Sequence, residues 1–267
     1  MPAFYAHYRF GRDVLSALPA HLHRLCTEHR ALYDIGLHGP DIFFFHRPLM
    51  PNAVARMGHR SHGTFGAEFL ERAGRAYDAA PDKPAFLAYF FGFLCHLALD
   101  AACHPEVYEA QKYTGASHTA IETALDRALL LDDGIDPLFH DPCGHFEITP
   151  ENAAVIAPFF PPLTAKTVEK SLRSMVFYGH LLYTRNPLLR KILDLTLYVT
   201  GHHDALFGMV MTPAPDTRCT ESDKALCGCY AAALPVALEL IEKAAIYIES
   251  RTEPDPVFAV NFKGQRN

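Results

Sequence analysis

Apolar residues recur along most of the chain at the three- and four-residue spacing of one face of an α-helix, and Pro and Gly stand between these segments. No stretch of useful length alternates apolar and polar residues as a half-buried strand does. There is no internal repeat and no low-complexity tract. The pattern therefore predicts an all-α fold, with a single multi-helix domain over residues 1–267. The predicted helices are Tyr5–Leu18, Ala20–His29, Ser61–Ala79, Lys83–Tyr113, Ser117–Leu131, Glu151–Phe159, Ala165–Thr184, Asn186–Thr200 and Glu221–Ser250.

Three segments lack this helical spacing. Residues 36–58 are rich in Pro and Gly, and residues 132–150 contain five acidic residues and three prolines. The tail after Arg251 is short and polar. We expect all three segments to be loops.

The chain shows no feature of a membrane or secreted protein. Its most apolar stretch, Phe86–Leu99, is shorter than the roughly 20 residues that a membrane span needs. The N-terminus lacks the basic and then apolar order of a signal peptide. The seven cysteines are odd in number and have no zinc-ribbon spacing. We expect a cytoplasmic protein with reduced thiols and no transmembrane segment.

The net charge and the number of histidines indicate which kinds of ligand the protein could bind. A formal net charge of −6 disfavours long nucleic acids as partners, because they bind broad basic surfaces. Sixteen histidines among 267 residues is a high number, and neutral imidazole is the commonest metal ligand. Composition alone does not distinguish metal ligands from ordinary core or surface histidines, so their spacing has to.

Five potential ligands lie on two consecutive predicted helices. In GFLCHLALDAACHP, His96, Asp100 and His104 follow one another at four-residue steps, so they share one helical face. The residues around them are strongly apolar, and a carboxylate buried there is costly unless it is paired or binds a metal. In SHTAIE, His118 and Glu122 form a second pair with this spacing. One such pair is usually a surface pair, but two consecutive helices of this kind indicate a metal site.

These motifs resemble the ligand pattern of zinc-dependent phospholipase C and of the related single-strand-specific zinc nucleases. GLHGPDIFFF, which carries Asp41, is also similar to a segment of small bacterial members of the phospholipase C family. So are MPAFYAHYRFG at the start of the chain and ALDRALLL after Glu122. The resemblance covers roughly residues 1–131. It implies the all-α fold of the phospholipase C and zinc nuclease type.

The resemblance also implies a site with two or three zinc ions. Asp41 would both bind metal and orient or deprotonate the attacking water. The amine of the processed N-terminus would be a further ligand. The implied ligands are Asp41, His62, His96 and Asp100 for the first ion, His104, His118 and Glu122 for the second, and His7 with a second oxygen of Asp100 for the third.

The chain departs from the family pattern in two places. Three residues separate Asp100 from His104, where the well-studied enzymes have five, and the chain has no Trp for the N-terminal position. His59 is an alternative to His62. We prefer His62 because it would begin the helix that leads to Phe69, as in the family motif.

The function implied is a metal-dependent phosphoester hydrolase, which attacks phosphorus with a hydroxide bound to two or three zinc ions. The substrate would be a small-molecule or lipid phosphoester. Alternatives are a nuclease on the same scaffold and a non-catalytic metal-binding protein. The oligomeric state is left open.

A third alternative is an HD-type phosphohydrolase built on the adjacent His203 and Asp204, with His180 and Asp216 as its other ligands. We expect His203 to lie outside the metal site. His38 and His46 flank Asp41 and are either donors to ligands or simple loop residues. Residues 140–147, which contain two further histidines, are expected to form a solvated loop.

Overall fold

The structure is a computed structural model that describes residues 4–267, except for the side chains of residues 204 and 205. The predicted all-α fold is confirmed, since the only strand-like pairs in that range are two isolated bridges. The α-helices are α1 Phe4–Ala17, α2 Ala20–Glu28, α3 Arg30–Gly36, α4 Ala53–Ser61, α5 Gly66–Ala79, α6 Lys83–Thr114, α7 His118–Asp132, α8 Pro150–Ile156, α9 Ala165–Leu182, α10 Pro187–Val199, α11 His203–Leu206 and α12 Thr220–Ser250. The 3₁₀ helices are η1 Gly39–Phe43, η2 Ala157–Phe159, η3 Phe207–Met209, η4 Thr217–Cys219 and η5 Pro256–Phe258.

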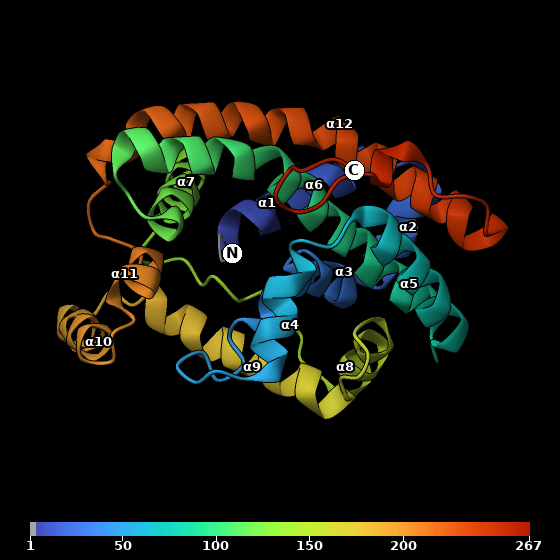
Figure 1. The fold of residues 1–267 in the computed structure, drawn as a ribbon, viewed down its shortest axis with the longest axis horizontal. Coiled ribbons are helices and arrows are strands. Elements are labelled where there is room, and N and C mark those ends of the chain that lie inside the picture. Colours follow the sequence, from blue (N-terminus) through green and yellow to red (C-terminus); the bar gives the residue numbers. More distant parts are fainter. Residues whose placement is uncertain (1–3) are drawn as a thin grey trace.

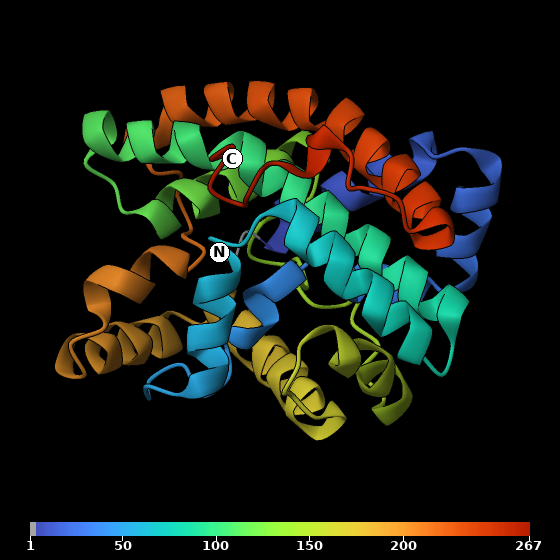
Figure 2. The same cartoon turned by 45° about the vertical axis from the view of Figure 1, so that its right-hand side comes forward.

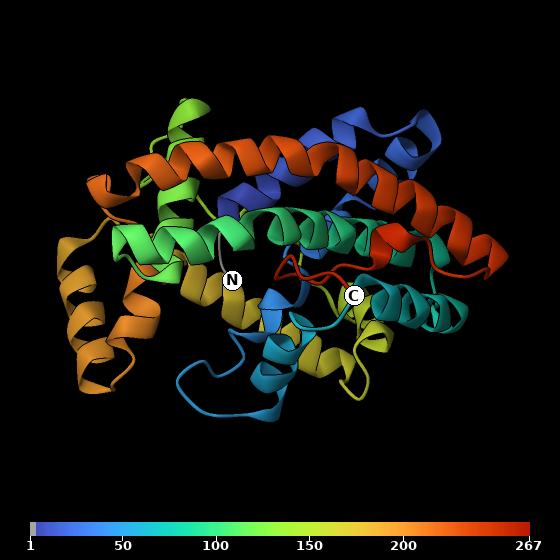
Figure 3. The ribbon, with the colours of Figure 1, turned by 45° about the horizontal axis from the view of Figure 1, so that its top comes forward.

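Helix α6 is the central element of the fold. It begins where the Asp82 side chain accepts a hydrogen bond from the backbone N–H of Ala85, and it ends at Gly115 in the left-handed conformation. Its apolar first half is buried on all sides, which is why its sequence shows no polar face. Helices α12, α3, α1, α2 and α5 pack around it. In Figures 1 and 3, α12 runs along one side of the molecule beside α6, and α8 to α11 lie on the other.

A close approach of two helices places the short helix η1 against α6. Helices α3 and α6 meet at Gly36 and Gly92, whose Cα atoms are near neighbours. A Cβ atom on Gly36 would lie 2.2 Å from the carbonyl oxygen of Tyr89, so neither helix has room for a side chain there. Because η1 follows α3 directly, this contact brings Asp41 to the part of α6 that carries His96 and Asp100.

The structure corrects several of the predicted boundaries. The segment 36–58, predicted as a loop, contains η1 and most of α4, which begins where Asn52 caps the backbone N–H of Ala55. The helix predicted from Ser61 begins only at Gly66. Helix α3 was missed; it is short, and an ion pair between Arg30 and Asp34 spans it.

The tail after Arg251, which the sequence presents as short and polar, folds back onto the protein. Phe258 and Phe262 are fully buried, and the ring of Phe262 packs against Phe69 and Phe93. Burial of these two aromatic side chains stabilises the packed position of the tail, even though most of the residues around them are polar. Figure 2 shows the C-terminus returning to the middle of the molecule.

Two helices, α6 and α12, are long and apolar enough to cross a membrane by length and composition alone. In α6, 83% of the apolar window is buried inside the protein, as in the core helix of a globular domain. In α12 the buried share is 28%. The absence of a transmembrane segment therefore stays a prediction.

Candidate metal centre

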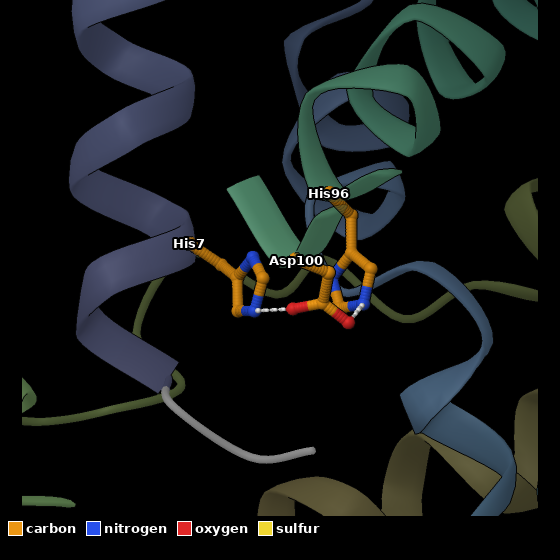
Figure 4. A group of neighbouring side chains, drawn as sticks. All are labelled: His7, His96 and Asp100. Carbon is orange, nitrogen blue, oxygen red and sulfur yellow. Dashed lines mark ion pairs between the residues drawn. The ribbon is translucent and has the colours of Figure 1, made fainter. Parts of the chain in front are cut away.

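Asp100 lies between histidines from two helices (Figure 4). Its Oδ1 is 3.4 Å from Nε2 of His7 on α1, and its Oδ2 is 3.3 Å from Nε2 of His96 on α6. The rings of His7 and His96 stack, with centroids 4.0 Å apart. All three side chains are buried. The two oxygens of one carboxylate thus face two different groups of donors.

Helix η1 and the end of α4 add two more side chains to this group. Oδ1 of Asp41 is 3.0 Å from Nε2 of His62 and 3.9 Å from Nε2 of His96. Nε2 of His62 is also 3.7 Å from Oδ2 of Asp100. Four side chains from three elements therefore point toward one small volume.

A second cluster lies one helical turn further along α6. Oε1 of Glu122 is 3.0 Å from Nε2 of His118 and 3.7 Å from Nε2 of His104. Ser117 caps α7 by accepting a hydrogen bond from the backbone N–H of Ala120, which fixes where His118 and Glu122 begin their shared face. The i, i+4 spacing in the sequence thus produces the geometry expected of it.

Together the eight side chains implied by the resemblance form three groups, in each of which the potential ligand atoms lie within 4.8 Å of one another. None of the three groups contains a cysteine. Carboxylate and imidazole donors without thiolate suit zinc, and also manganese or iron. The groups are His7, His96 and Asp100; Asp41, His62 and His96; and His104, His118 and Glu122.

Three of the histidines are held by backbone carbonyl groups. In each of them Nδ1 lies at hydrogen-bond distance from a carbonyl oxygen, so Nδ1 carries the proton and Nε2 keeps its lone pair. This is the tautomer that a metal needs at Nε2. The acceptors are Gly58 for His62, Leu37 for His96 and Phe262 for His104, at 3.0, 3.0 and 2.5 Å.

The donor set fits metal ions for a second reason. Several polar atoms that face the site are buried and have no hydrogen-bond partner among the described residues. Such atoms are costly inside a protein unless another group satisfies them. A cation at each cluster would do so. The atoms are Nε2 of His62, Nε2 of His96, Oδ2 of Asp100 and Oε2 of Glu122.

The electrostatics of the site favour the metal-binding protonation states of His7, His104 and Asp100. Burial lowers the pKa of His7 to about 4, and burial also lowers the pKa of His104, so both imidazoles are neutral at pH 7. Burial alone would raise the pKa of Asp100, but His104 and His96 beside it hold that pKa well below its usual value. Burial also opposes protonation of His96 and His118, but the carboxylates of Asp100 and Glu122 raise their pKa values, so a cation bound there would take the place of a proton.

The contact between His104 and the carbonyl group of Phe262 was not predicted from the sequence. Pro105 follows His104 inside α6 and has no N–H, so the helix leaves the carbonyl oxygen of Ala101 without its usual donor. The tail approaches there through Gly264, at φ +73°, where a Cβ atom would lie 2.6 Å from that oxygen. A glycine is therefore required for the tail to reach His104.

The structure places His62 differently from the prediction. His62 does not begin the helix that leads to Phe69; it is the residue directly after α4, and α5 starts four residues later. His59, its alternative, is exposed and belongs to none of the three groups. Its ring lies against Phe44, whose other neighbour is the ring of His62.

Asp126 fixes the end of α1 that carries His7. It is fully buried and accepts hydrogen bonds from the backbone N–H groups of Tyr5 and Ala6, at 3.0 and 2.7 Å, and from the hydroxyl of Tyr183, at 2.6 Å. These backbone groups belong to the first turn of α1, where no helical acceptor exists.

We expect Asp126→Asn to lower the free energy of unfolding by about 3 kcal/mol, because an amide cannot accept all three bonds and leaves buried donors unsatisfied. Urea denaturation of the zinc-loaded protein measures this. The matched variant is Asp132→Asn, which changes an exposed carboxylate one turn and a half further along α7. Equal losses in the two variants would contradict the capping role.

The residues of the HD-type alternative whose side chains the structure describes have separate partners. Nε2 of His203 is 3.0 Å from Oδ1 of Asp194, and Nε2 of His180 is 2.9 Å from Oδ1 of Asp141. Asp216 is paired with Arg218. These separate partners do not favour a common metal site. The side chain of Asp204 and the N-terminal amine lie outside the described residues.

The segment 140–147 is not a solvated loop throughout. His145 stacks on Tyr8 at 4.1 Å and shares a 2.7 Å hydrogen bond with the buried His38. Cys143 is buried as well. The segment therefore packs against Tyr8 of α1 and against His38, the residue before η1. Of the two histidines that flank Asp41, His38 is thus bonded to His145, and His46 is hydrogen-bonded to Ser171.

Comparison with known proteins identifies the family. A family model described as zinc dependent phospholipase C matches residues 6–153, more than half of the 267 residues. None of the curated proteins and none of the solved structures matches the chain. The matched region contains all eight residues of the candidate metal centre, from His7 to Glu122. The chain belongs to the zinc-dependent phospholipase C family.

Proposed function

We propose that the protein is a zinc-dependent phosphoester hydrolase of the phospholipase C type that uses two or three metal ions. One observation carries the proposal: three groups of buried His, Asp and Glu donors adjoin one another, and Asp100 directs one oxygen to His7 and the other to His96 and His62. A carboxylate in that position suits a bridging role between two cations.

Bound zinc would supply Lewis-acid chemistry, since it lowers the pKa of water and offsets charge on phosphoryl oxygens. The eight ligand side chains named above would hold the ions. Asp41 is the residue that we propose to orient or deprotonate the attacking water, because its carboxylate faces both His62 and His96, two of the proposed ligands of the first ion. The carbonyl groups behind His62, His96 and His104 would keep these rings in place during turnover.

The substrate class that we propose is a lipid phosphoester, as the family description suggests. A nuclease on the same scaffold and a non-catalytic metal-binding protein are the alternatives. The formal charge of −6 disfavours a long nucleic acid, since the protein has a small excess of carboxylates over basic residues.

One experiment separates these functions. Purified protein is assayed for metal content, and then for hydrolysis of a chromogenic phosphocholine diester, a phosphomonoester and single-stranded DNA, with and without a chelator. We expect two or three zinc ions per chain and chelator-sensitive hydrolysis of the phosphocholine diester. Preferred cleavage of DNA would favour the nuclease. Metal without any hydrolysis would favour a binding protein, and the absence of metal would contradict the proposal.

A further inference from the structure

An apolar pocket of about 500 Å³ lies beside the metal centre. Helix α9 forms one wall, α10 a second, and the loop before α4 a third. Thirteen of its sixteen lining residues are apolar, and the exceptions are His59, Tyr178 and Thr196. No Asp, Glu, Lys or Arg lines the pocket. Figures 1, 2 and 3 all show α10 and this loop on the same side of the molecule, near α9.

The pocket shares a wall with the metal centre. Phe44 lines the pocket, and its ring stacks on the ring of His62 with centroids 5.1 Å apart. Nε2 of His62 is in turn 3.0 Å from Asp41. One aromatic ring therefore separates the apolar pocket from the first group of ligands. A chain bound in this pocket would lie one aromatic ring away from the candidate ligands His62 and Asp41.

The pocket is open to solvent along an apolar rim. Leu49 and Ile192 line it and are 36% and 51% exposed. Met50 and Leu188 continue this apolar rim outward and are more exposed still. Apolar side chains on both sides of an opening favour the entry of a hydrocarbon chain, because contact between apolar surfaces removes both of them from water.

We propose that this pocket binds one acyl or alkyl chain of the phosphoester substrate, and that it makes hydrolysis depend on chain length. The volume lies within the range of small-molecule sites, and the lining leaves a charged or strongly polar ligand without partners. The inference rests on the proposed function for the phosphoryl end of the ligand. The binding of the chain can be tested apart from it.

The test uses a substitution that fills the pocket and a matched one that does not. Leu193→Trp places a bulky indole ring in the pocket, whereas Leu195→Trp adds the same ring at an exposed position of the same helix. The chain contains no Trp, so each variant also carries a single reporter of its local environment. Circular dichroism and zinc content establish that both variants are folded and loaded.

The first measurement is binding to the zinc-loaded protein of 11-dansylaminoundecanoic acid, with dansylglycine as the probe that lacks the chain. We expect the long-chain probe to bind at least tenfold more tightly than dansylglycine to the parent and to Leu195→Trp. In Leu193→Trp this preference should fall by about tenfold. Equal binding of the two probes, or equal behaviour of the two variants, would overturn the proposal whether or not the protein hydrolyses anything.

The second measurement compares kcat/KM for a diacyl phosphocholine, kept below its critical micelle concentration, with that for a phosphocholine ester without chains. The ratio should fall about tenfold in Leu193→Trp and stay within twofold in Leu195→Trp. An unchanged ratio in Leu193→Trp would overturn the proposal and leave the hydrolase assignment intact. Sedimentation of both variants provides a further check, because a change of mass in Leu193→Trp alone would make the pocket a contact between copies and would also overturn it.

Discussion

Asp100→Asn should abolish hydrolysis, with a loss of roughly a thousandfold or more, and should remove more than one metal ion per chain. Both carboxylate oxygens of Asp100 face candidate ligands: Oδ1 faces His7, and Oδ2 faces His96 and His62. An amide offers one oxygen and turns an N–H donor toward a histidine nitrogen that must itself accept a metal. Asp100 belongs to the group with His7 and His96, and its Oδ2 also faces His62 of a second group, so loss of this side chain should affect both groups.

The same variant should also be less stable than the parent, because the energy of metal binding contributes to folding. The midpoint of thermal unfolding should fall in Asp100→Asn, and excess zinc should restore it less well than in the parent. Metal analysis, steady-state kinetics and calorimetry on one preparation measure the three effects. A variant with full metal content and normal turnover would contradict the bridging role of Asp100.

Two controls accompany this prediction. Asp78→Asn makes the same chemical change at an exposed carboxylate that pairs with Arg251, and it should leave metal content and rate unchanged. His203→Ala removes the histidine of the HD-type alternative and should alter KM at most. Loss of metal and activity in His203→Ala together with a mild effect of Asp100→Asn would favour that alternative instead.

The local part of the site was predictable because helix geometry is local. Residues four apart on a helix share a face whatever surrounds them, so His96, Asp100 and His104 could be grouped from their spacing alone. The same holds for His118 and Glu122. Asp41, His62 and His7 lie on other elements, and only the resemblance to the family linked them to these two helices.

The parts that could not be predicted depend on contacts far apart in the sequence. The carbonyl of Phe262 holds a residue 158 positions earlier, and the polar run around it hides two aromatic residues that are fully buried. His62 was placed at the start of a helix because a helical pattern continues on both sides of it. The structure instead ends α4 just before His62, so the carbonyl oxygen of Gly58 is free of a helical backbone donor and accepts a hydrogen bond from Nδ1 of His62.

Gly39 illustrates the same limit and leads to a prediction. Gly-Pro in the sequence indicates only a turn, but in the structure Gly39 has φ +48° and lies directly against the ring of His96. A Cβ atom there would be 2.6 Å from Cδ2 and 2.7 Å from Cγ of that ring. The ring cannot move away easily, since it stacks on His7 and its Nδ1 is bonded to the carbonyl of Leu37.

We expect Gly39→Ala to lower kcat/KM by about a hundredfold, because a displacement of a catalytic group by about 1 Å has an effect of that size. It should also reduce metal content, since His96 belongs to two of the three groups. The matched variant is Gly134→Ala, at φ +71° with no atom within 4 Å of the added Cβ. Both variants suffer the left-handed backbone penalty of about 1–2 kcal/mol, which denaturant titration measures. Only Gly39→Ala should lose zinc and activity. If both variants lose stability to the same extent and both keep their zinc and their rate, then the contact between Gly39 and His96 does not position the metal ligand.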